Sequence, residues 1–228
     1  MFSLKQAVGL FDVYQTKIQE CDAEIAGTLA RFDKKGDSST LPKAPKKKRR
    51  KNQPHFDGRA LLYEMAGVDL TAVAGLEAST ILTILSETGT DMAPWNSGKH
   101  FSAWLAVSPN NRVTGGRLIY KKGPVIRPNR AAQAFRIAAQ TLERAQCALG
   151  AFFRRVQSRH GRSSAIKATA HKLALIFYSM LKNHTEYKDL GVNYYEERYR
   201  ERLLNSIKRN AANLGFQLVP LPLLGEVH

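Results

Sequence analysis

Apolar side chains recur every seven residues along the first part of this chain. A second position, apolar or small, follows three residues after most of them, and this spacing places both sets on one side of an α-helix. A helix with such a seam buries it only against another helix. The sequence therefore predicts a coiled-coil helix over residues 1–33, paired with a second copy of the chain or with a helix outside it. The seam comprises Leu4, Phe11, Ile18, Ile25 and Phe32, together with Ala7, Tyr14 and Cys21.

Helical periodicity resumes at residue 57 and predicts a mainly α fold. Asp57 is placed to cap a helix that runs to Ala66. Residues 70–89 then predict two short helices joined by a tight turn at Gly75, a unit that resembles a helix-hairpin-helix. The amides of such a turn can hold a backbone phosphate. Because Glu77 beside the turn would repel a phosphate, a packing role for this unit is favoured.

Further helices are expected beyond residue 96. Ser97 is placed to cap the first of them, which turns Phe101 and Trp104 inward. Strand character is confined to two short stretches, residues 118–120 and 125–126. A compact helical domain is thus predicted over 57–220, followed by a tail at 221–228. The longer helices within that domain are predicted over residues 130–159, 164–182 and 193–212.

A strongly basic segment separates the first helix from this domain. Residues 34–56 are rich in Pro, Ser and Lys, and seven basic residues fall between positions 43 and 51. Such a block repels itself and cannot bury apolar surface, so it is predicted to be a flexible linker. Two interpretations stay open, a solvated linker and a strip that contacts a phosphate backbone. In the second, the contacts are Lys47, Arg49 and Arg50.

The charge of the chain favours a polyanionic partner. Lys and Arg number 35 against 19 Asp and Glu, which gives a formal net charge of +16. Nucleic acid is the first candidate, and no membrane partner is expected because no lipidation signal or membrane-spanning apolar run is visible. Cys21 and Cys147 lie far apart, and the histidines lack metal-ligand spacing. No metal site and no cofactor are therefore predicted within this chain.

The polar stretch at 108–130 is the strongest candidate for a functional loop, because long loops inside compact domains are commonly functional or disordered. Thr114 precedes two glycines, Gly115 and Gly116, which allow close backbone approach. Arg112 and Arg117 lie on either side of this Thr-Gly-Gly segment, and each guanidinium can bind two oxygens of a phosphate. A phosphate-binding loop and a hydroxyl nucleophile both fit, with the former favoured by the residues alone. Further contacts to nucleic acid are predicted at Lys121, Lys122, Arg127 and Arg130.

Five motifs resemble one protein family when taken in order. They are "GLEASTILTILSETGTDM", "KHFSAWLAVSPNNRVTGGR", "NRAAQAFRIAAQTL", "ALGAFFRR" and "ATAHKLA". The chain resembles, over nearly all of residues 2–220, the C-terminal half of the bridge-RNA-guided insertion-sequence transposases, the IS-one-ten and IS-one-sixteen family related to the Piv DNA invertase. In that family an N-terminal RuvC-like domain with a carboxylate metal site is joined through a coiled coil to a C-terminal transposase domain.

The resemblance implies a role in DNA transposition. Thr114 stands where the family has its nucleophilic serine, and Gly115, Gly116 and Arg117 match the rest of that motif. The threonine keeps the hydroxyl but adds a methyl group and stiffens χ1. Magnesium is expected in the RuvC-like domain, which the resemblance places outside this sequence. DNA, a guide (bridge) RNA and a second protomer joined through the coiled coil are the implied partners, in the prokaryotic cytoplasm at the nucleoid.

Two functions from different classes follow. The first is a DNA-binding transposase portion that cleaves and transfers strands through a hydroxyl nucleophile, guided by RNA. The alternative is a catalytically silent module or regulator that binds nucleic acid and oligomerises. The two differ in what the Thr114 hydroxyl does, because only the enzyme needs it.

Overall fold

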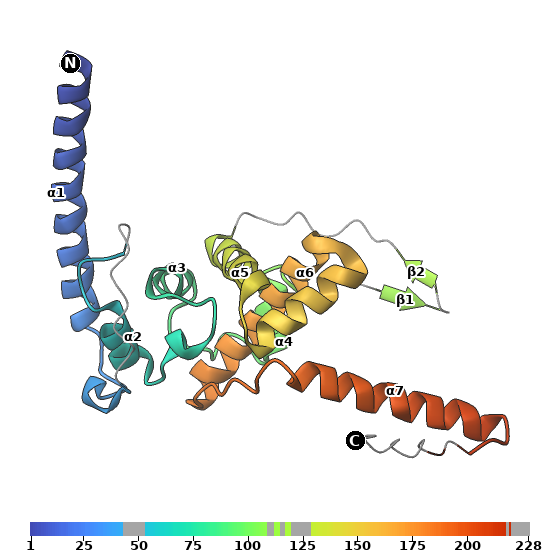
Figure 1. Ribbon diagram of the computed structural model, residues 1–228. Coiled ribbons are helices and arrows are strands. Elements are labelled where there is room, and N and C mark those ends of the chain that lie inside the picture. The colour runs from blue at the N-terminus through green and yellow to red at the C-terminus, as the bar shows by residue number, and fades with distance from the viewer. Residues whose placement is uncertain (43–52, 109–111, 115–116, 120–128, 218, 220–228) are drawn as a thin grey trace, which may run out of the picture.

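The computed structural model describes residues 1–42, 53–108, 112–114, 117–119, 129–217 and 219, and shows a mainly helical fold, as predicted. A single hairpin of two short strands interrupts the helices among these residues. Figure 1 shows a central group of helices from which α1 and α7 extend at opposite ends. The elements are α1 (Phe2–Ala30), η1 (Ser38–Thr40), α2 (Gly58–Ala66), η2 (Leu70–Ala72), α3 (Ala78–Thr88), α4 (Gly98–Trp104), β1 (Arg112–Thr114), β2 (Arg117–Ile119), α5 (Arg130–Thr141), η3 (Leu142–Arg144), α6 (Ala148–Asn183) and α7 (Tyr194–Asn213).

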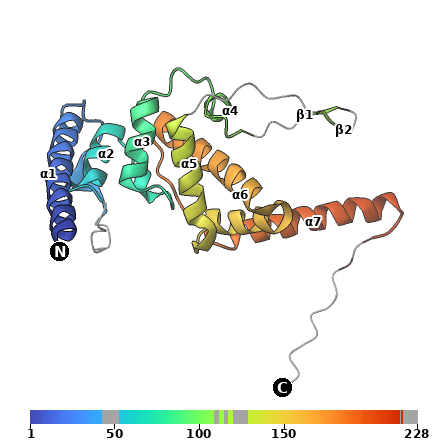
Figure 2. The ribbon, with the colours of Figure 1, turned by 90° about the horizontal axis from the view of Figure 1, so that it is seen from above.

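Helix α1 stands beside α2 and reaches well past it, as both ribbon views show (Figures 1 and 2). It meets the rest of the chain along a face that includes Leu29 and Asp22, whose Oδ2 accepts a hydrogen bond from the backbone N–H of His55 at 2.9 Å. Asp22 and Leu29 each lie four residues after a seam residue, at the edge of the predicted seam, and the large side chains of the seam itself are exposed. The long helix is therefore confirmed, whereas its pairing with a second helix stays a prediction.

The linker predicted over residues 34–56 contacts α2 where the structure describes it. Residues 34–42 lie along α2, where two polar side chains of the segment bind Glu64, and the flexibility of the linker stays a prediction. The Ser38 hydroxyl donates to the Glu64 carboxylate at 2.6 Å, and Lys34 approaches it at 2.9 Å. The hydrogen bond from Ser38 has the largest effect on the pKa of Glu64, followed by that from Lys34, and together they hold this pKa below its ordinary value. Residues 43–52, which carry the basic run, lie outside the described residues.

The predicted helix-hairpin-helix is wrong in its first helix. Helix α2 begins at the Asp57 cap as expected, but residues 70–72 form one 3-10 turn. The Asp69 carboxylate accepts from both the N–H and the hydroxyl of Thr71, and the chain bends at Gly75 too soon afterwards for a second turn. An ideal Cβ at Gly75 would lie 2.9 Å from the carbonyl oxygen of Ala138, so the bend packs against α5.

Helices α3, α4, α5 and α6 enclose the core. Aromatic rings of Phe101, Phe135 and Phe177 meet at its centre, where all three side chains are fully buried. Small residues of α5, including Ala131 and Ala138, let the neighbouring helices approach closely. The close contact of α5 with α3 on one side and α6 on the other positions the candidate site described below.

The single helix predicted over 130–159 is two helices. Helix α5 ends at Thr141, the turn η3 follows, and α6 begins at Ala148 with the Cys147 thiol accepting from the N–H of Gly150. The break is stabilised by Arg154, whose Nη1 donates to the carbonyl oxygens of Glu143 and Ala145. Periodicity alone did not predict it because the alanine pattern continues through the break.

Helix α6 contains the separate helix that was predicted over 164–182. The two segments join at Gly161, where φ is 79° and ψ is 168°, so the helix bends there. Helix α7 follows the prediction for 193–212 closely. Of the predicted strands, 118–120 corresponds to β2, β1 was not predicted, and 125–126 falls outside the described residues. None of the helices in the described ranges is long and apolar enough to cross a membrane.

Candidate nucleic-acid interface

The functional loop contains an antiparallel hairpin. Strands β1 and β2 pair with Thr114 opposite Arg117 and Arg112 opposite Ile119. Directly opposed residues share a face of a β-ladder, and so do residues two apart along one strand. The register therefore puts positions 112, 114 and 117 on one face of the hairpin, with the hydroxyl residue between two cationic ones. The sequence predicted this grouping for a loop and did not predict that strand pairing would produce it.

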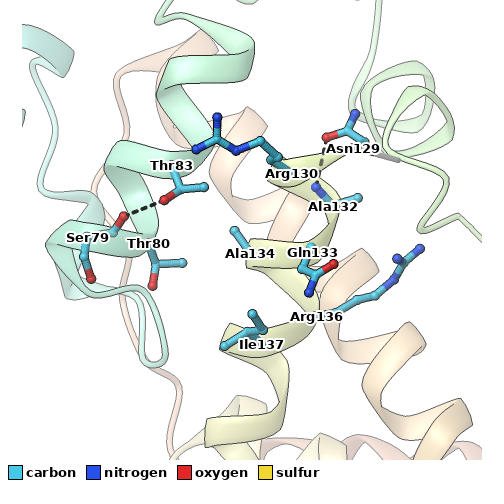
Figure 3. Close-up of a pocket in the computed structure, with 10 residues that line it drawn as sticks. All are labelled: Ser79, Thr80, Thr83, Asn129, Arg130, Ala132, Gln133, Ala134, Arg136 and Ile137. Atoms are coloured by element: carbon cyan, nitrogen blue, oxygen red, sulfur yellow. Dashed lines mark hydrogen bonds between the residues drawn. The ribbon is translucent and has the colours of Figure 1, made fainter. Parts of the chain in front are cut away.

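Both ends of this loop return to one groove. The chain leaves α4 at Ala106, whose carbonyl oxygen lies 3.4 Å from Nη2 of Arg136 on α5. It comes back at Asn129, whose side chain caps α5 by accepting from the N–H of Ala132 at 3.1 Å. Asn129 and Arg136 both line a groove of about 540 Å³ between α3 and α5 (Figure 3). The described residues that precede and follow the loop, Ala106 and Asn129, are thus both bound to α5.

The groove combines hydroxyl, amide and guanidinium groups with the apolar side chains of Ala132, Ala134 and Ile137. Helix α3 contributes hydroxyl groups at Ser79, Thr80 and Thr83, and the Thr83 hydroxyl donates to the carbonyl oxygen of Ser79. In Figure 3 the Arg130 side chain extends from α5 toward α3, whereas Arg136 points to the opposite side. The remaining lining residues belong to α5 and are Ala132, Gln133, Ala134 and Ile137.

The two arginines of the groove can bind phosphate oxygens. Arg130 has an exposed side chain, and its contact with Glu87 is long, at 3.7 Å between Nε and Oε1. Arg136 makes one weak contact to a carbonyl oxygen at 3.4 Å. A guanidinium carries five N–H donors in a fork that matches phosphate geometry. The position of Arg130 at the N-terminal end of α5 adds the favourable end of the helix dipole.

Asp69 acts as a helix cap and as the partner of a basic side chain. Asp69 accepts from Arg59 at 2.6 and 3.0 Å. Burial raises the pKa of Asp69, but hydrogen bonds from Arg59 and Thr71 outweigh that effect and hold the pKa below its ordinary value. Within the described ranges no three His, Cys, Asp or Glu side chains gather as metal ligands.

The predicted site residues fall into three groups. Arg130 is described in full and lines the groove. Arg112, Thr114 and Arg117 are placed by the backbone of the hairpin. The rest lie outside the described residues and are Gly115, Gly116, Lys121, Lys122, Arg127, Lys47, Arg49 and Arg50.

The sequence did not predict that Arg136 and the α3 residues of the groove would be site residues. Ser79, Thr80 and Thr83 lie within the first of the five quoted motifs, but that motif assigns them no role, and their place in the groove depends on the packing of α3 against a helix about fifty residues later in the chain. A hydroxyl at positions 79 and 83, four apart on one helix face, is the only local signal.

Comparison of the chain with protein-family models, with curated proteins and with solved structures gave no match.

Proposed function

We propose that this chain binds nucleic acid at the hairpin and the α3–α5 groove, and that it acts in DNA recombination during transposition. The observation that carries the proposal is the register of β1 and β2, which groups positions 112, 114 and 117 on one face. A hydroxyl between two guanidiniums suits the binding of a phosphodiester. The α3–α5 groove contributes two further arginines, Arg130 and Arg136, and the formal net charge of +16 supports a polyanionic partner.

The proposed reaction uses the Thr114 hydroxyl as a nucleophile. Its Oγ1 attacks a backbone phosphorus, a new Oγ1–P ester forms, and one P–O bond of the DNA strand breaks to release an end with a free hydroxyl. The number of phosphate esters is unchanged, so a hydroxyl of another strand can reverse the step and join to it. Arg112 and Arg117 stabilise the added charge on the phosphate oxygens.

The proposed partners are DNA, a guide RNA and a second protomer. The exposed seam of α1 supports the last of these, since Leu4, Ile18 and Ile25 remain solvent-accessible along one side of a long helix. A partner protomer that carries a RuvC-like domain would bring the metal site that the family resemblance implies.

Replacing Thr114 with alanine is expected to abolish a covalent protein–DNA adduct. The full chain is mixed with target DNA, guide RNA, magnesium and a protomer that contains a RuvC-like domain, and the adduct is sought on a denaturing gel. Thr114→Ser is the matched variant and keeps the adduct, because it retains the hydroxyl without the methyl group. Thr16→Ala removes an exposed hydroxyl on α1 and leaves the adduct unchanged. An adduct that persists in Thr114→Ala would contradict the nucleophile assignment.

The second candidate function is a non-catalytic module that binds nucleic acid and oligomerises. It is favoured by the groove and by the α1 seam, neither of which depends on the Thr114 hydroxyl. The same experiment separates the two functions. Salt-sensitive binding without any adduct in the unsubstituted chain would support the module over the enzyme.

A further inference from the structure

Trp104 lies on the surface, although the sequence predicted that it would face the core. It is the last residue of α4 and is 46 % exposed, whereas Phe101 and Leu105 on the same segment are fully buried. The prediction was wrong because α4 is short and ends at this residue, and the chain then turns through Ala106 with a positive φ of 52°. His100, four residues earlier and therefore on the same helix face, is exposed as well.

The indole of Trp104 is held in place from below. Its ring centroid lies 5.3 Å from that of Trp95 and 6.4 Å from that of Phe101, whose ring is inclined to it by only 20°. Phe101 is itself fixed in the core against Phe135 and Phe177. Trp104 therefore presents a supported aromatic surface to solvent. Because its side chain is already held in place, little side-chain entropy is lost when a flat ligand stacks on it.

A basic side chain is bound to the aromatic cluster beneath Trp104. On the side of Trp95, Lys182 of α6 donates to the Tyr178 hydroxyl at 2.8 Å and to the Asn96 carbonyl oxygen at 3.4 Å. The Tyr178 hydroxyl in turn donates to the carbonyl oxygen of Trp95 at 2.7 Å, which connects the ammonium group to the aromatic cluster. Lys99 is exposed on α4. An aromatic platform together with nearby positive charge is an arrangement that binds single-stranded nucleic acid.

We propose that Trp104 stacks an unpaired nucleobase of a nucleic-acid strand. The inference rests on the proposed nucleic-acid binding and adds the feature that is recognised, an unstacked base. Four residues after Trp104 the chain enters the functional loop. Arg136 of the groove contacts Ala106, two residues beyond Trp104, so a strand whose phosphates bind the groove passes close to the end of α4. The positive charge favours a nucleobase over an apolar peptide as the occupant, because a peptide would leave these cations unmatched.

Tryptophan fluorescence offers a direct test, because the chain has only two tryptophans. In full-length Trp95→Phe, Trp104 is the sole emitter. Stacking of a base on its ring is expected to quench the emission when a thymidine or uridine oligonucleotide is titrated in. A duplex closed by covalent links at both ends, which offers no unpaired base, is expected to bind without comparable quenching. The thymidine and uridine arms distinguish DNA from RNA as the source of the base.

Binding by a Trp104→Ala variant completes the test. Loss of the indole is expected to weaken binding of the single strand by about tenfold, while the affinity for the closed duplex stays the same. Trp104→Phe keeps an aromatic face and retains most of the affinity, and it covers the case in which the alanine variant folds poorly. Equal affinities of Trp104→Ala and the unsubstituted chain for the single strand, without quenching in Trp95→Phe, would overturn the stacking role. Failure of every nucleic acid to bind would overturn the proposed function, and this inference with it.

Discussion

Replacement of Phe101 by alanine is expected to lower the free energy of unfolding by about 4 kcal/mol, which is typical of a buried phenylalanine. Phe101 is fully buried and its ring lies 5.0 Å from that of Trp95, 5.8 Å from that of Tyr178 and 6.4 Å from that of Phe177. The substitution removes the ring that joins α4 to α6 and leaves a cavity that the surrounding aromatic side chains cannot fill. Urea unfolding followed by circular dichroism measures the change.

The matched control for Phe101 is Phe2→Ala on α1. Phe2 is 77 % exposed, so its removal is expected to change the free energy of unfolding by less than about 0.5 kcal/mol. Similar losses in the two variants would show that Phe101 does not hold the core together. Phe101→Ala is also expected to reduce the affinity for single-stranded nucleic acid, since the Phe101 ring supports Trp104.

The substitution Gly150→Ala is expected to destabilise the protein by about 3 kcal/mol, at the upper end of the usual cost of overpacking. An ideal Cβ at this position would lie 2.1 Å from the carbonyl oxygen of Ala145 and 2.9 Å from that of Leu142. Both neighbours are backbone atoms of the break between α5 and α6. The methyl group can be accommodated only if that break opens, which would also disturb the contacts of Arg154 with the carbonyl oxygens there.

The matched control for Gly150 is Gly9→Ala. Gly9 lies inside the exposed helix α1, and an ideal Cβ there meets no atom within 4 Å. Alanine is the better helix former by roughly 0.5–1 kcal/mol, so this variant is expected to be more stable than the unsubstituted chain. In the same urea unfolding measurement, the two glycine substitutions are expected to change the free energy of unfolding in opposite directions. Equal effects would show that α5 and α6 do not meet as closely as the structure has them.

Local sequence signals predicted the fold wherever the controlling contacts are local. Asp57, Ser97 and Asn129 each accept a hydrogen bond from a backbone N–H in the first turn of the helix that follows. The first two were predicted as caps because a short polar side chain at that position satisfies an otherwise unpaired donor. The long exposed helix α1 and the helix α7 were likewise predicted from periodicity.

Features that depend on contacts between distant residues were not predicted. The break at residues 145–147 depends on Gly150 and Arg154, which close over it from the next helix. The exposure of Trp104 depends on where α4 ends, which apolar spacing does not specify. For the same reason the sequence predicted Arg130 as a contact residue but did not predict the groove that it lines, because the second wall of that groove comes from α3.

The central claim is that the groove and hairpin bind the phosphate backbone, and the salt dependence of nucleic-acid binding tests it most directly. The affinity for a short DNA duplex would be measured over a range of salt concentrations for the unsubstituted chain and for the double variant Arg130→Gln/Arg136→Gln. Each phosphate contact contributes about −0.9 to the slope of log affinity against log salt, so the double variant is expected to lose about two from the magnitude of the slope. The control Lys5→Gln/Arg31→Gln removes the same charge from α1 and the residue that follows it, and its slope is expected to match that of the unsubstituted chain. A slope near zero for the unsubstituted chain, or one that the groove variant leaves unchanged, would contradict the account.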